Sequence, residues 1–459
     1  MIDHLREHTG LYLLILFWVG VTVAPGPWIY AVLPLSVFLM RQKEAWPDMI
    51  MGFLIILILS DMNPGLVPMR KVKTAKYGYI VALSIVFLID TARFYPISNI
   101  FKIFLPFFIY SFFPLLFSGS PVIGFEKTVS YALLYLIVPN YILMNYRQQG
   151  WNFFRNFLFF IIIVLWFSRV MTYFTPYWWT FIEGRFRGLF GNPNGLGIFS
   201  FLTFILAYTI NYMNKQLFSQ REKIIVFGSI FYFLIACGSR TSLVASLMFL
   251  GFARFFSLSP FFGFLAFLAF IALLEVAQNN VVFIVRSLGV EEYFRVETLA
   301  DGSGRYFAWQ FAWERITNDG FFLFGGGFGN DEYIMRQHYP YLRSMGHHGG
   351  VHNSYLTMWF NTGIIGILLF FRSFILMFIK ANKQAPIAFA LMFSVIFSVL
   401  YESWLTGSLN PFTIMLLIVM TMMSEEEIIG HQHAPEEEEK EHEDQAGVHR
   451  LPPAMGVRT

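Results

Sequence analysis

The sequence predicts an all-α polytopic integral membrane protein with about 12–14 transmembrane helices. The first observation is composition: 56% of the 459 residues are hydrophobic, 13% are charged, and phenylalanine occurs 56 times. These values lie well outside the range of soluble domains. The second observation is a series of apolar runs, several of them near the ~20 residues that span hydrocarbon. The runs cover residues 11–24, 26–40, 48–60, 77–90, 100–117, 128–145, 153–170, 194–213, 222–237, 239–257, 260–277, 353–379, 385–401 and 408–423.

The first run follows no basic segment with a small-residue cleavage site, so we do not expect a cleaved signal peptide. The single cysteine, Cys237, lies inside an apolar run. One cysteine cannot form an intrachain disulfide, and we expect Cys237 to pack without binding a metal.

Basic residues orient the predicted helices. By the positive-inside rule, the short basic loops near 147–155, 215–223 and 380–383 should be cytoplasmic, with an even number of runs between successive loops. The connections at 171–193 and 278–351 should then face outward. The second connection is too long for an ordinary link between helices, which predicts a functional element.

One basic segment disagrees with this orientation. Arg70, Lys71, Lys73 and Lys76 would lie outside if every early run crosses once. Either one early run does not cross the membrane or the rule fails there. The topology before about residue 120 therefore stays open.

The long loop at 278–351 contains arginines and acidic residues but no lysine. The guanidinium fork holds phosphate or carboxylate oxygens with two hydrogen bonds, so individual arginines matter more than bulk charge. Within the loop, 303–318 reads as a helix with Ser303 as its N-cap, and Arg305 and Trp309 share one stripe. An amphipathic helix anchored in the interface is compatible with a substrate role for Arg305, because first-turn N–H groups favour an anion.

Three polar motifs each precede or begin a long apolar run: Gly-Asn-Pro-Asn at 191–194, Ser-Arg-Thr-Ser at 239–242 and Val-His-Asn-Ser at 351–354. If the three helices cross the membrane in one direction, their N-termini meet at one face. Helix N-termini carry partial positive charge and free N–H groups. We therefore expect a site for an anionic, lipid-linked substrate.

The ordered set of motifs between about 185 and 410 resembles the O-antigen ligase/polymerase superfamily. The segments that carry the resemblance are Arg-Gly-Leu-Phe-Gly-Asn-Pro-Asn (187–194), Gly-Ser-Arg-Thr-Ser (238–242), Gly-Arg-Tyr-Phe-Ala-Trp (304–309), the glycine run at 325–329, His-Asn-Ser-Tyr-Leu (352–356) with Gly363 and Gly366, and Glu402-Ser403. The resemblance implies a GT-C-like, metal-independent glycosyltransferase without a cofactor, in the inner (cytoplasmic) membrane of a Gram-negative bacterium. Such an enzyme transfers a glycan from undecaprenyl diphosphate to an acceptor hydroxyl at the periplasmic face, with inversion.

Candidate roles follow from this chemistry. Arg187, Arg240 and Arg305 are expected to bind the diphosphate, and His352 is expected to act as the base toward the acceptor. The supporting residues are Asn194, Ser239, Trp309, Asn353 and Glu402. The alternatives are plainer: the arginines are interfacial cations, His352 caps its helix, and Glu402 pairs with an arginine or orients substrate.

Metal and nucleotide sites are not expected. His347, His348 and His352 come with no matching cysteine or acidic ligand. The glycine run at 325–329 lacks the Lys-Ser/Thr of a P-loop, which favours a turn near the substrate.

We favour a polymerase that joins repeat units, with a ligase that attaches glycan to lipid A–core as the alternative. A transporter or flippase is a more distant alternative, and the lack of evident internal repeats argues against it. The expected partners are the lipid-linked donor, a glycan or lipid A–core acceptor and membrane lipid, together with a flippase and a chain-length regulator, and no nucleic acid.

Two regions are predicted. Residues 1–424 form the polytopic membrane domain, with 278–351 as its long periplasmic loop. Residues 425–459 form an acidic, disordered cytoplasmic tail, because their composition cannot bury a core.

Overall fold

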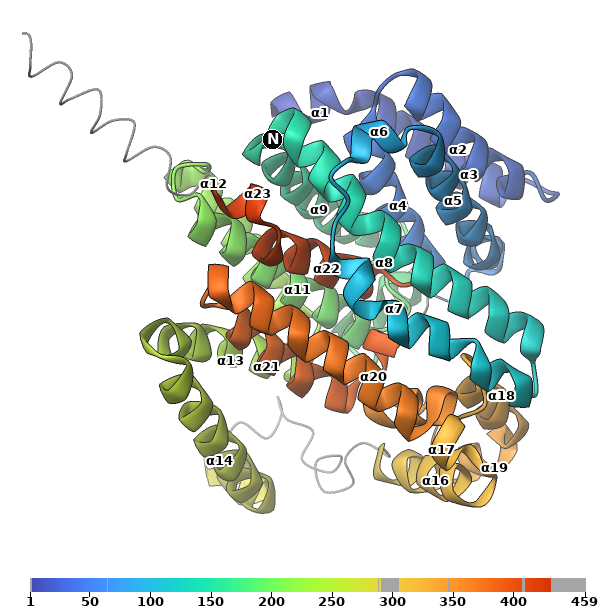
Figure 1. Cartoon of the computed structure of the whole chain (residues 1–459), viewed down its shortest axis with the longest axis vertical. Coiled ribbons are helices and arrows are strands. Elements are labelled where there is room, and N and C mark those ends of the chain that lie inside the picture. Colours follow the sequence, from blue (N-terminus) through green and yellow to red (C-terminus); the bar gives the residue numbers. More distant parts are fainter. Residues whose placement is uncertain are drawn as a thin grey trace, which may run out of the picture.

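The computed structural model describes residues 2–63, 65–287, 289, 305–345, 347, 349–406 and 409–430. Within these residues the chain is a bundle of long helices with one two-stranded antiparallel hairpin (Figure 1). The predicted all-α class is confirmed, and every expected apolar run contains a helix.

Residues 2–180 form the first set of helices. They are α1 (Ile2–Glu7), α2 (Thr9–Val23), α3 (Ile29–Gln42), α4 (Trp46–Ser60), η1 (Val67–Met69), α5 (Arg70–Ile89), α6 (Thr91–Phe94), α7 (Ile100–Ser111), η2 (Phe113–Phe117), α8 (Pro121–Gln149), α9 (Trp151–Val170), η3 (Met171–Tyr173) and α10 (Tyr177–Thr180).

The hairpin and the remaining helices follow. They are β1 (Phe181–Ile182), β2 (Arg185–Phe186), α11 (Pro193–Met213), α12 (Gln220–Ala236), α13 (Arg240–Leu258), α14 (Pro260–Ser287), α16 (Arg305–Asn318), α17 (Phe321–Phe324), α18 (Asn330–Gln337), α19 (Tyr339–Ser344), α20 (Ser354–Gln384), α21 (Ala388–Tyr401), η6 (Trp404–Thr406), α22 (Pro411–Ser424) and α23 (Glu426–Ile429).

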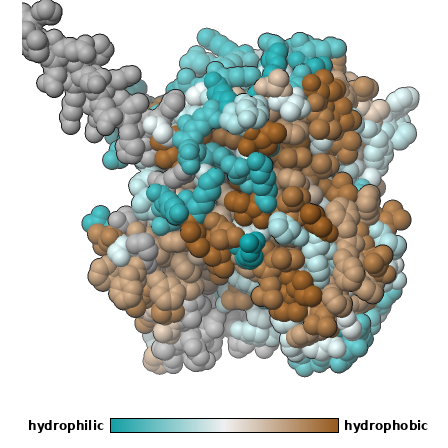
Figure 2. Space-filling view, in the orientation of Figure 1, coloured by the Kyte–Doolittle hydropathy of each residue, from teal (hydrophilic) through white to brown (hydrophobic). Residues whose placement is uncertain are grey.

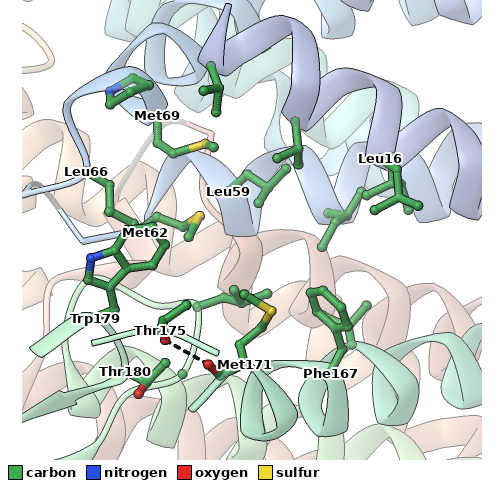
Figure 3. Close-up of a pocket in the computed structure, with 18 of the residues that line it drawn as sticks. Leu16, Leu59, Met62, Leu66, Met69, Phe167, Met171, Thr175, Trp179 and Thr180 are labelled. Atoms are coloured by element: carbon green, nitrogen blue, oxygen red, sulfur yellow. Dashed lines mark hydrogen bonds between the residues drawn. The ribbon is translucent and has the colours of Figure 1, made fainter. Parts of the chain in front are cut away.

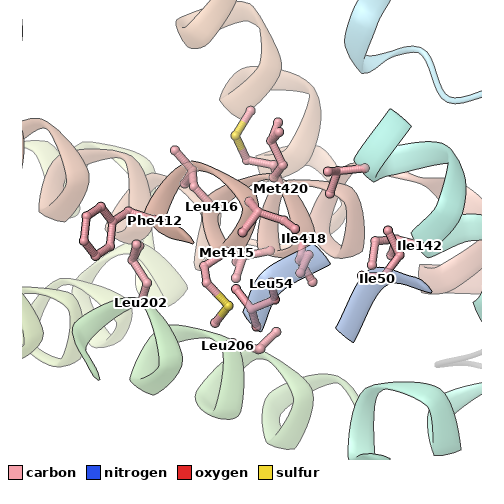
Figure 4. Packing of buried hydrophobic residues seen from close by; sticks show 14 of the residues in the cluster. Ile50, Leu54, Ile142, Leu202, Leu206, Phe412, Met415, Leu416, Ile418 and Met420 are labelled. Atoms are coloured by element: carbon pink, nitrogen blue, oxygen red, sulfur yellow. The ribbon is translucent and has the colours of Figure 1, made fainter. Parts of the chain in front are cut away.

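Helices α4 and α22 are apolar on every face, a pattern typical of helices surrounded by protein. Both are buried along their whole length, and α22 packs against α4, α8, α11 and α20. Figure 4 shows Leu54, Leu206 and Met415 meeting between α4, α11 and α22. The core therefore lies around these central helices.

Six described helical segments are long and apolar enough to cross a membrane: Val67–Ile89, Ile100–Phe117, Pro121–Gln149, Trp151–Tyr173, Pro193–Met213 and Ser354–Lys383. Six shorter apolar helices accompany them: Thr9–Val23, Ile29–Gln42, Trp46–Ser60, Phe261–Phe270, Ala388–Tyr401 and Pro411–Ser424. Hydrophobic side chains cover much of the face in Figure 2, and hydrophilic ones gather at its top. The chain has the features of a multi-pass membrane protein.

Helix α20 is broken near its start. Gly363 adopts φ 65° and ψ −177°. A Cβ at this position would collide with the carbonyl of Leu323 in α17, so a larger residue would not fit here. The glycine run also packs here, because the N–H groups of Gly326 and Gly327 donate to the carbonyls of Phe360 and Asn361 (3.0 and 2.8 Å). The glycine run is therefore a turn bonded to α20.

The basic segment at 70–76 lies at the end of the bundle where α11, α20 and α22 begin, which we call the motif end. Lys76 Nζ donates to the carbonyl of Leu409, 2.7 Å away and just before α22. The opposite end holds Arg147, which pairs with Glu427 just after α22. Both alternatives for the early topology stay predictions, because the helices alone do not show which end of the bundle faces outward.

Two boundaries differ from the prediction. Helix α14 extends to Ser287, ten residues into the segment expected to be loop, whereas Ser303 lies outside the described residues. At the start of the predicted tail, residues 425–430 pack on the bundle: Glu425 Oε1 accepts from Ser98 Oγ (2.6 Å), and Ile428 and Ile429 are buried. Apolar burial and these polar contacts order residues 425–430, whereas the rest of the predicted tail, 431–459, lies outside the described residues.

Candidate functional site

The three polar motifs stand at helix N-termini, as predicted. Asn192 caps α11, because its side-chain oxygen accepts from the N–H of Gly195 (2.7 Å). Asn353 caps α20 by accepting from the N–H groups of Tyr355 and Leu356 (2.9 and 3.1 Å). Ser239 immediately precedes the first residue of α13.

The starts of α11 and α13 are in contact. A Cβ at Gly197 would collide with the side chain of Ser239, so glycine is required for this close approach. Ser239 Oγ in turn lies 2.9 Å from Ser242 Oγ. This contact brings the second motif against the first.

Glu402 joins the first motif to α16. Its Oε1 accepts from Asn194 Nδ2 at 2.8 Å and from Arg305 Nη2 at 2.7 Å. The Glu402 side chain is only 10% exposed, so its charge is screened little by water. Of the two alternatives for Glu402, the pair with an arginine is present in the structure, whereas orientation of substrate stays a prediction.

His352 brings the third motif to the same carboxylate. Its Nδ1 lies 3.4 Å from Glu402 Oε2, and the hydroxyl of Ser354 donates to the Glu402 carbonyl (2.8 Å). The backbone of His352 has φ 50°, a conformation that is uncommon outside glycine and costs free energy. Such strain is found most often at functional sites.

Arg185 is the residue that the sequence reasoning missed. Its Nη2 donates to Asn194 Oδ1 (2.7 Å), and its Nε donates to the carbonyl of Cys237 (2.9 Å). Arg185 therefore links the hairpin, the end of α12 and the start of α11. Cys237 itself is buried and packs, as predicted. The motif at 187–194 includes Arg187 but not Arg185, so no signal in the sequence indicated Arg185.

Arg187 has a different setting from the one we expected. Its guanidinium donates to three backbone carbonyls, those of Trp178, Trp179 and Gly191, and the residue is 5% exposed. Burial lowers the pKa of this guanidinium from its ordinary value. These contacts close the 178–191 loop, and a role for Arg187 toward diphosphate stays a prediction.

Arg240 and Trp309 lie on two of the helices near the motifs, α13 and α16. Arg240 is the first residue of α13 and is half-buried. Trp309 lies one turn after Arg305 on α16, and its ring packs against Tyr306 and Tyr401, with centroids 5.4 and 6.2 Å apart. Trp309 therefore contacts the residue that directly precedes Glu402.

A second charged group lies on another side of the start of α11. Asp61 is half-buried, and this burial raises the pKa of its carboxyl to about 6, although Lys76 and the N–H of Gly191 counteract this shift. A Cβ at Gly195 would come within 3.5 Å of Asp61 Oδ2. The N-terminus of α11 is thus flanked by Asp61 as well as by Glu402.

Among the described residues, no group of three or more His, Cys, Asp or Glu side chains could hold a metal ion. His348 lies outside the described residues. Metal independence therefore remains a prediction.

Residues 225–371, about a third of the chain, match the family model described as O-antigen ligase (Wzy_C). This segment is similar to the O-antigen ligase family. This match confirms the superfamily to which the ordered motifs pointed, and it includes Ser239, Arg240, Arg305, His352 and Asn353. Comparison with curated protein sequences gave no significant match.

The O-antigen ligase family implies a glycosyltransferase-like enzyme that acts on polysaccharide and lipid-linked substrates. Three residues of the site, Arg185, Asn194 and Glu402, lie outside the matched segment. They are bonded to one another, and Arg185 and Glu402 contact the matched segment at Cys237 and Arg305.

Proposed function

We propose that this protein is an inverting, metal-independent glycosyltransferase that moves a glycan from undecaprenyl diphosphate to an acceptor hydroxyl at the periplasmic face of the inner membrane. The observation that carries the proposal is the meeting of His352, Arg305 and Asn194 at one buried carboxylate, Glu402. These four residues come from α11, α16, the start of α20 and the end of α21.

The donor side of the reaction requires positive charge. When the anomeric C–O bond breaks, negative charge develops on the departing diphosphate, and preorganised N–H donors and arginines stabilise it. The helix N-termini that begin at Pro193 and Arg240 supply partial positive charge at the motif end. Full positive charges in the same region come from Arg185, Arg240 and Arg305. Of these arginines, Arg305 is paired with the carboxylate of Glu402.

The acceptor side requires a base. With Glu402 Oε2 facing Nδ1, the imidazole of His352 carries its proton on Nδ1 and offers Nε2 as the acceptor. Nε2 then takes the acceptor hydroxyl proton while that oxygen bonds to the anomeric carbon, and the electron pair of the breaking bond leaves with the diphosphate. A single displacement of this kind inverts the anomeric configuration.

We assign the reaction to polymerisation of repeat units. Attachment of the glycan to lipid A–core is the second candidate, favoured by the description of the matched family model as an O-antigen ligase. Both reactions use the same donor chemistry and differ in the acceptor. A flippase and a chain-length regulator are the proposed partners of the polymerase.

The test is transfer by the purified protein in vesicles that contain glycan-bearing undecaprenyl diphosphate. Products of increasing length with repeat-unit donor alone support the polymerase, and transfer only when lipid A–core is present supports the ligase. Absence of transfer to either acceptor by folded protein would contradict the proposal. A chelator in a parallel reaction tests metal independence, and we expect no change in rate.

A further inference from the structure

An apolar cavity of about 480 Å³ lies between α2, α4 and α9. Its remaining wall comes from the two connections 62–69 and 171–189. Figure 3 shows Leu16 and Phe167 toward one end of the cavity, and Met62, Leu66 and Trp179 toward the other. The lining is almost entirely hydrocarbon, so the cavity offers little to a polar ligand.

The first end of the cavity reaches the apolar exterior of the bundle. Leu16 is 61% exposed and Phe167 is 50% exposed, although both side chains line the cavity. In a membrane protein these exposed apolar side chains face lipid. A hydrocarbon chain could therefore enter from the bilayer between α2 and α9.

The second end of the cavity adjoins the motif end. Two lining residues lie close in sequence to the site: Met62 directly follows Asp61, and Leu189 is four residues before the start of α11 at Pro193. The backbone N–H groups of Arg187 and Gly188 donate to the carbonyl of Thr180 (2.8 and 3.2 Å), which fixes this wall. Five residues beyond Leu189, Asn194 contacts Glu402.

We propose that this cavity binds the diphosphate-proximal isoprene units of the polyprenyl chain of the lipid-linked donor. The inference rests on the proposed function and adds a lipid site to it. A single ligand that carries an apolar chain and an anionic headgroup matches the two ends of the cavity: hydrocarbon contacts inside, and the N-terminus of α11 beside Met62 at the motif end. The volume is that of a pocket for a small molecule, so the rest of a long polyprenyl chain lies in the bilayer.

Leu59 and Leu88 provide a matched pair of test positions. Leu59 lines the cavity and is 7% exposed, whereas Leu88 on α5 is 70% exposed on the outside of the bundle. Leu59→Trp fills the cavity, and Leu88→Trp adds the same side chain to the apolar exterior. Equal expression and equal elution profiles of the two variants show that both fold.

The binding probe is undecaprenyl diphosphate with a diazirine in the isoprene unit nearest the diphosphate, added to the full-length protein in vesicles. We expect crosslinks to peptides within 55–69 and 163–189, competition by unlabelled undecaprenyl diphosphate, and about tenfold weaker labelling of Leu59→Trp than of Leu88→Trp. Crosslinks only elsewhere would overturn the inference. Equal labelling by a diazirine-bearing phospholipid, without competition, would also overturn it and identify a general lipid groove.

A transfer assay separates this inference from the proposed function. With a glycan donor on a two-isoprene carrier, Leu59→Trp should match Leu88→Trp, whereas with the full-length carrier its KM should rise about tenfold. Equal loss with both carriers would contradict a role in chain binding. Labelling of the cavity in a wild-type protein that transfers no glycan would instead contradict the proposed function and leave the lipid site standing.

Discussion

Arg305 and Glu402, 97 residues apart in sequence, form an ion pair in which Arg305 Nη2 lies 2.7 Å from Glu402 Oε1. The pair ties α16, the first helix after the undescribed part of the long loop, to the connection between α21 and α22. Both side chains are mostly buried, at 20% and 10% exposure. A buried pair of this kind is costly to break from one side, because the remaining charge loses its partner.

Replacing Glu402 tests its proposed role in orienting His352. Glu402→Gln keeps the shape but removes the charge that fixes the imidazole tautomer, so transfer should fall by roughly 10²–10⁴-fold. Glu427→Gln is the matched control, because Glu427 also pairs with an arginine but at the opposite end of the bundle. Initial rates with lipid-linked donor measure the difference. Equal rates for the two variants would remove Glu402 from the mechanism.

Replacing His352 separates the base from the donor site. His352→Asn tolerates the positive φ of this position better than alanine does, so it removes the base with little change in backbone strain. We expect undiminished binding of undecaprenyl diphosphate and a loss of transfer of about 10²–10⁴-fold in both His352→Asn and His352→Ala. His338→Asn, on the same outer segment, should transfer normally. Loss of donor binding would move His352 to the diphosphate side.

Lysine variants distinguish diphosphate binding from anchoring in the interface. Arg240→Lys and Arg305→Lys keep the charge but lose the guanidinium fork, so transfer should drop while expression and insertion stay unchanged. Arg93→Lys is the control, because Arg93 pairs with the exposed Glu44 away from the motifs. If the arginines only anchor the protein in the interface, all three lysine variants should be equally active. That result would exclude diphosphate binding by Arg240 and Arg305.

Arg187 should act mainly on stability. Arg187→Ala removes the arginine donor from the carbonyls of Trp179 and Gly191, whereas the carbonyl of Trp178 keeps a hydrogen bond from Asn63 Nδ2. A carbonyl that loses its partner in a partly buried setting costs roughly 1–3 kcal/mol. We expect a lower thermal midpoint in detergent, whereas Arg336→Ala, at a side chain that is 80% exposed, should leave it unchanged. An unchanged midpoint with lost donor binding would support the diphosphate role predicted from sequence.

The topology predicts which positions a membrane-impermeant thiol reagent reaches. In a Cys237→Ser background, Glu183→Cys and Ser344→Cys should be labelled in spheroplasts, because both are exposed at the motif end. Gln216→Cys, in a connection predicted to be cytoplasmic, should be labelled only after lysis. The reverse pattern would place the site on the cytoplasmic side and contradict the periplasmic reaction.

Much of the fold was predictable because spans leave a strong signal in composition. Each apolar run became a helix, and Asn192 and Asn353 cap helices as their motifs indicate. The start of the tail was not predictable, because the burial of Ile428 and the pairing of Glu427 depend on neighbours far away in sequence.

The candidate site was predictable in its members but not in its contacts. The motifs identify Asn194, Arg305 and His352, yet no spacing rule indicates that all three meet at Glu402. Arg185 escaped notice because only the turn of the hairpin decides that Arg185 faces Asn194 while Arg187 closes its own loop. Such choices are made by tertiary packing, which a single sequence does not encode locally.

Because α20 is broken at Gly363, the orientation of its first turns does not depend on the orientation of the rest of the helix. An unbroken helix transmits its tilt rigidly, but at Gly363 the regular dihedral angles are interrupted. Residues 354–362 contact α16, α17 and α18 through Trp359 and Asn361, and Tyr355 bonds to the carbonyl of Ile396 on α21. If His352 acts as the proposed base, its alignment with the acceptor depends on these outer helices and not on the tilt of the rest of α20.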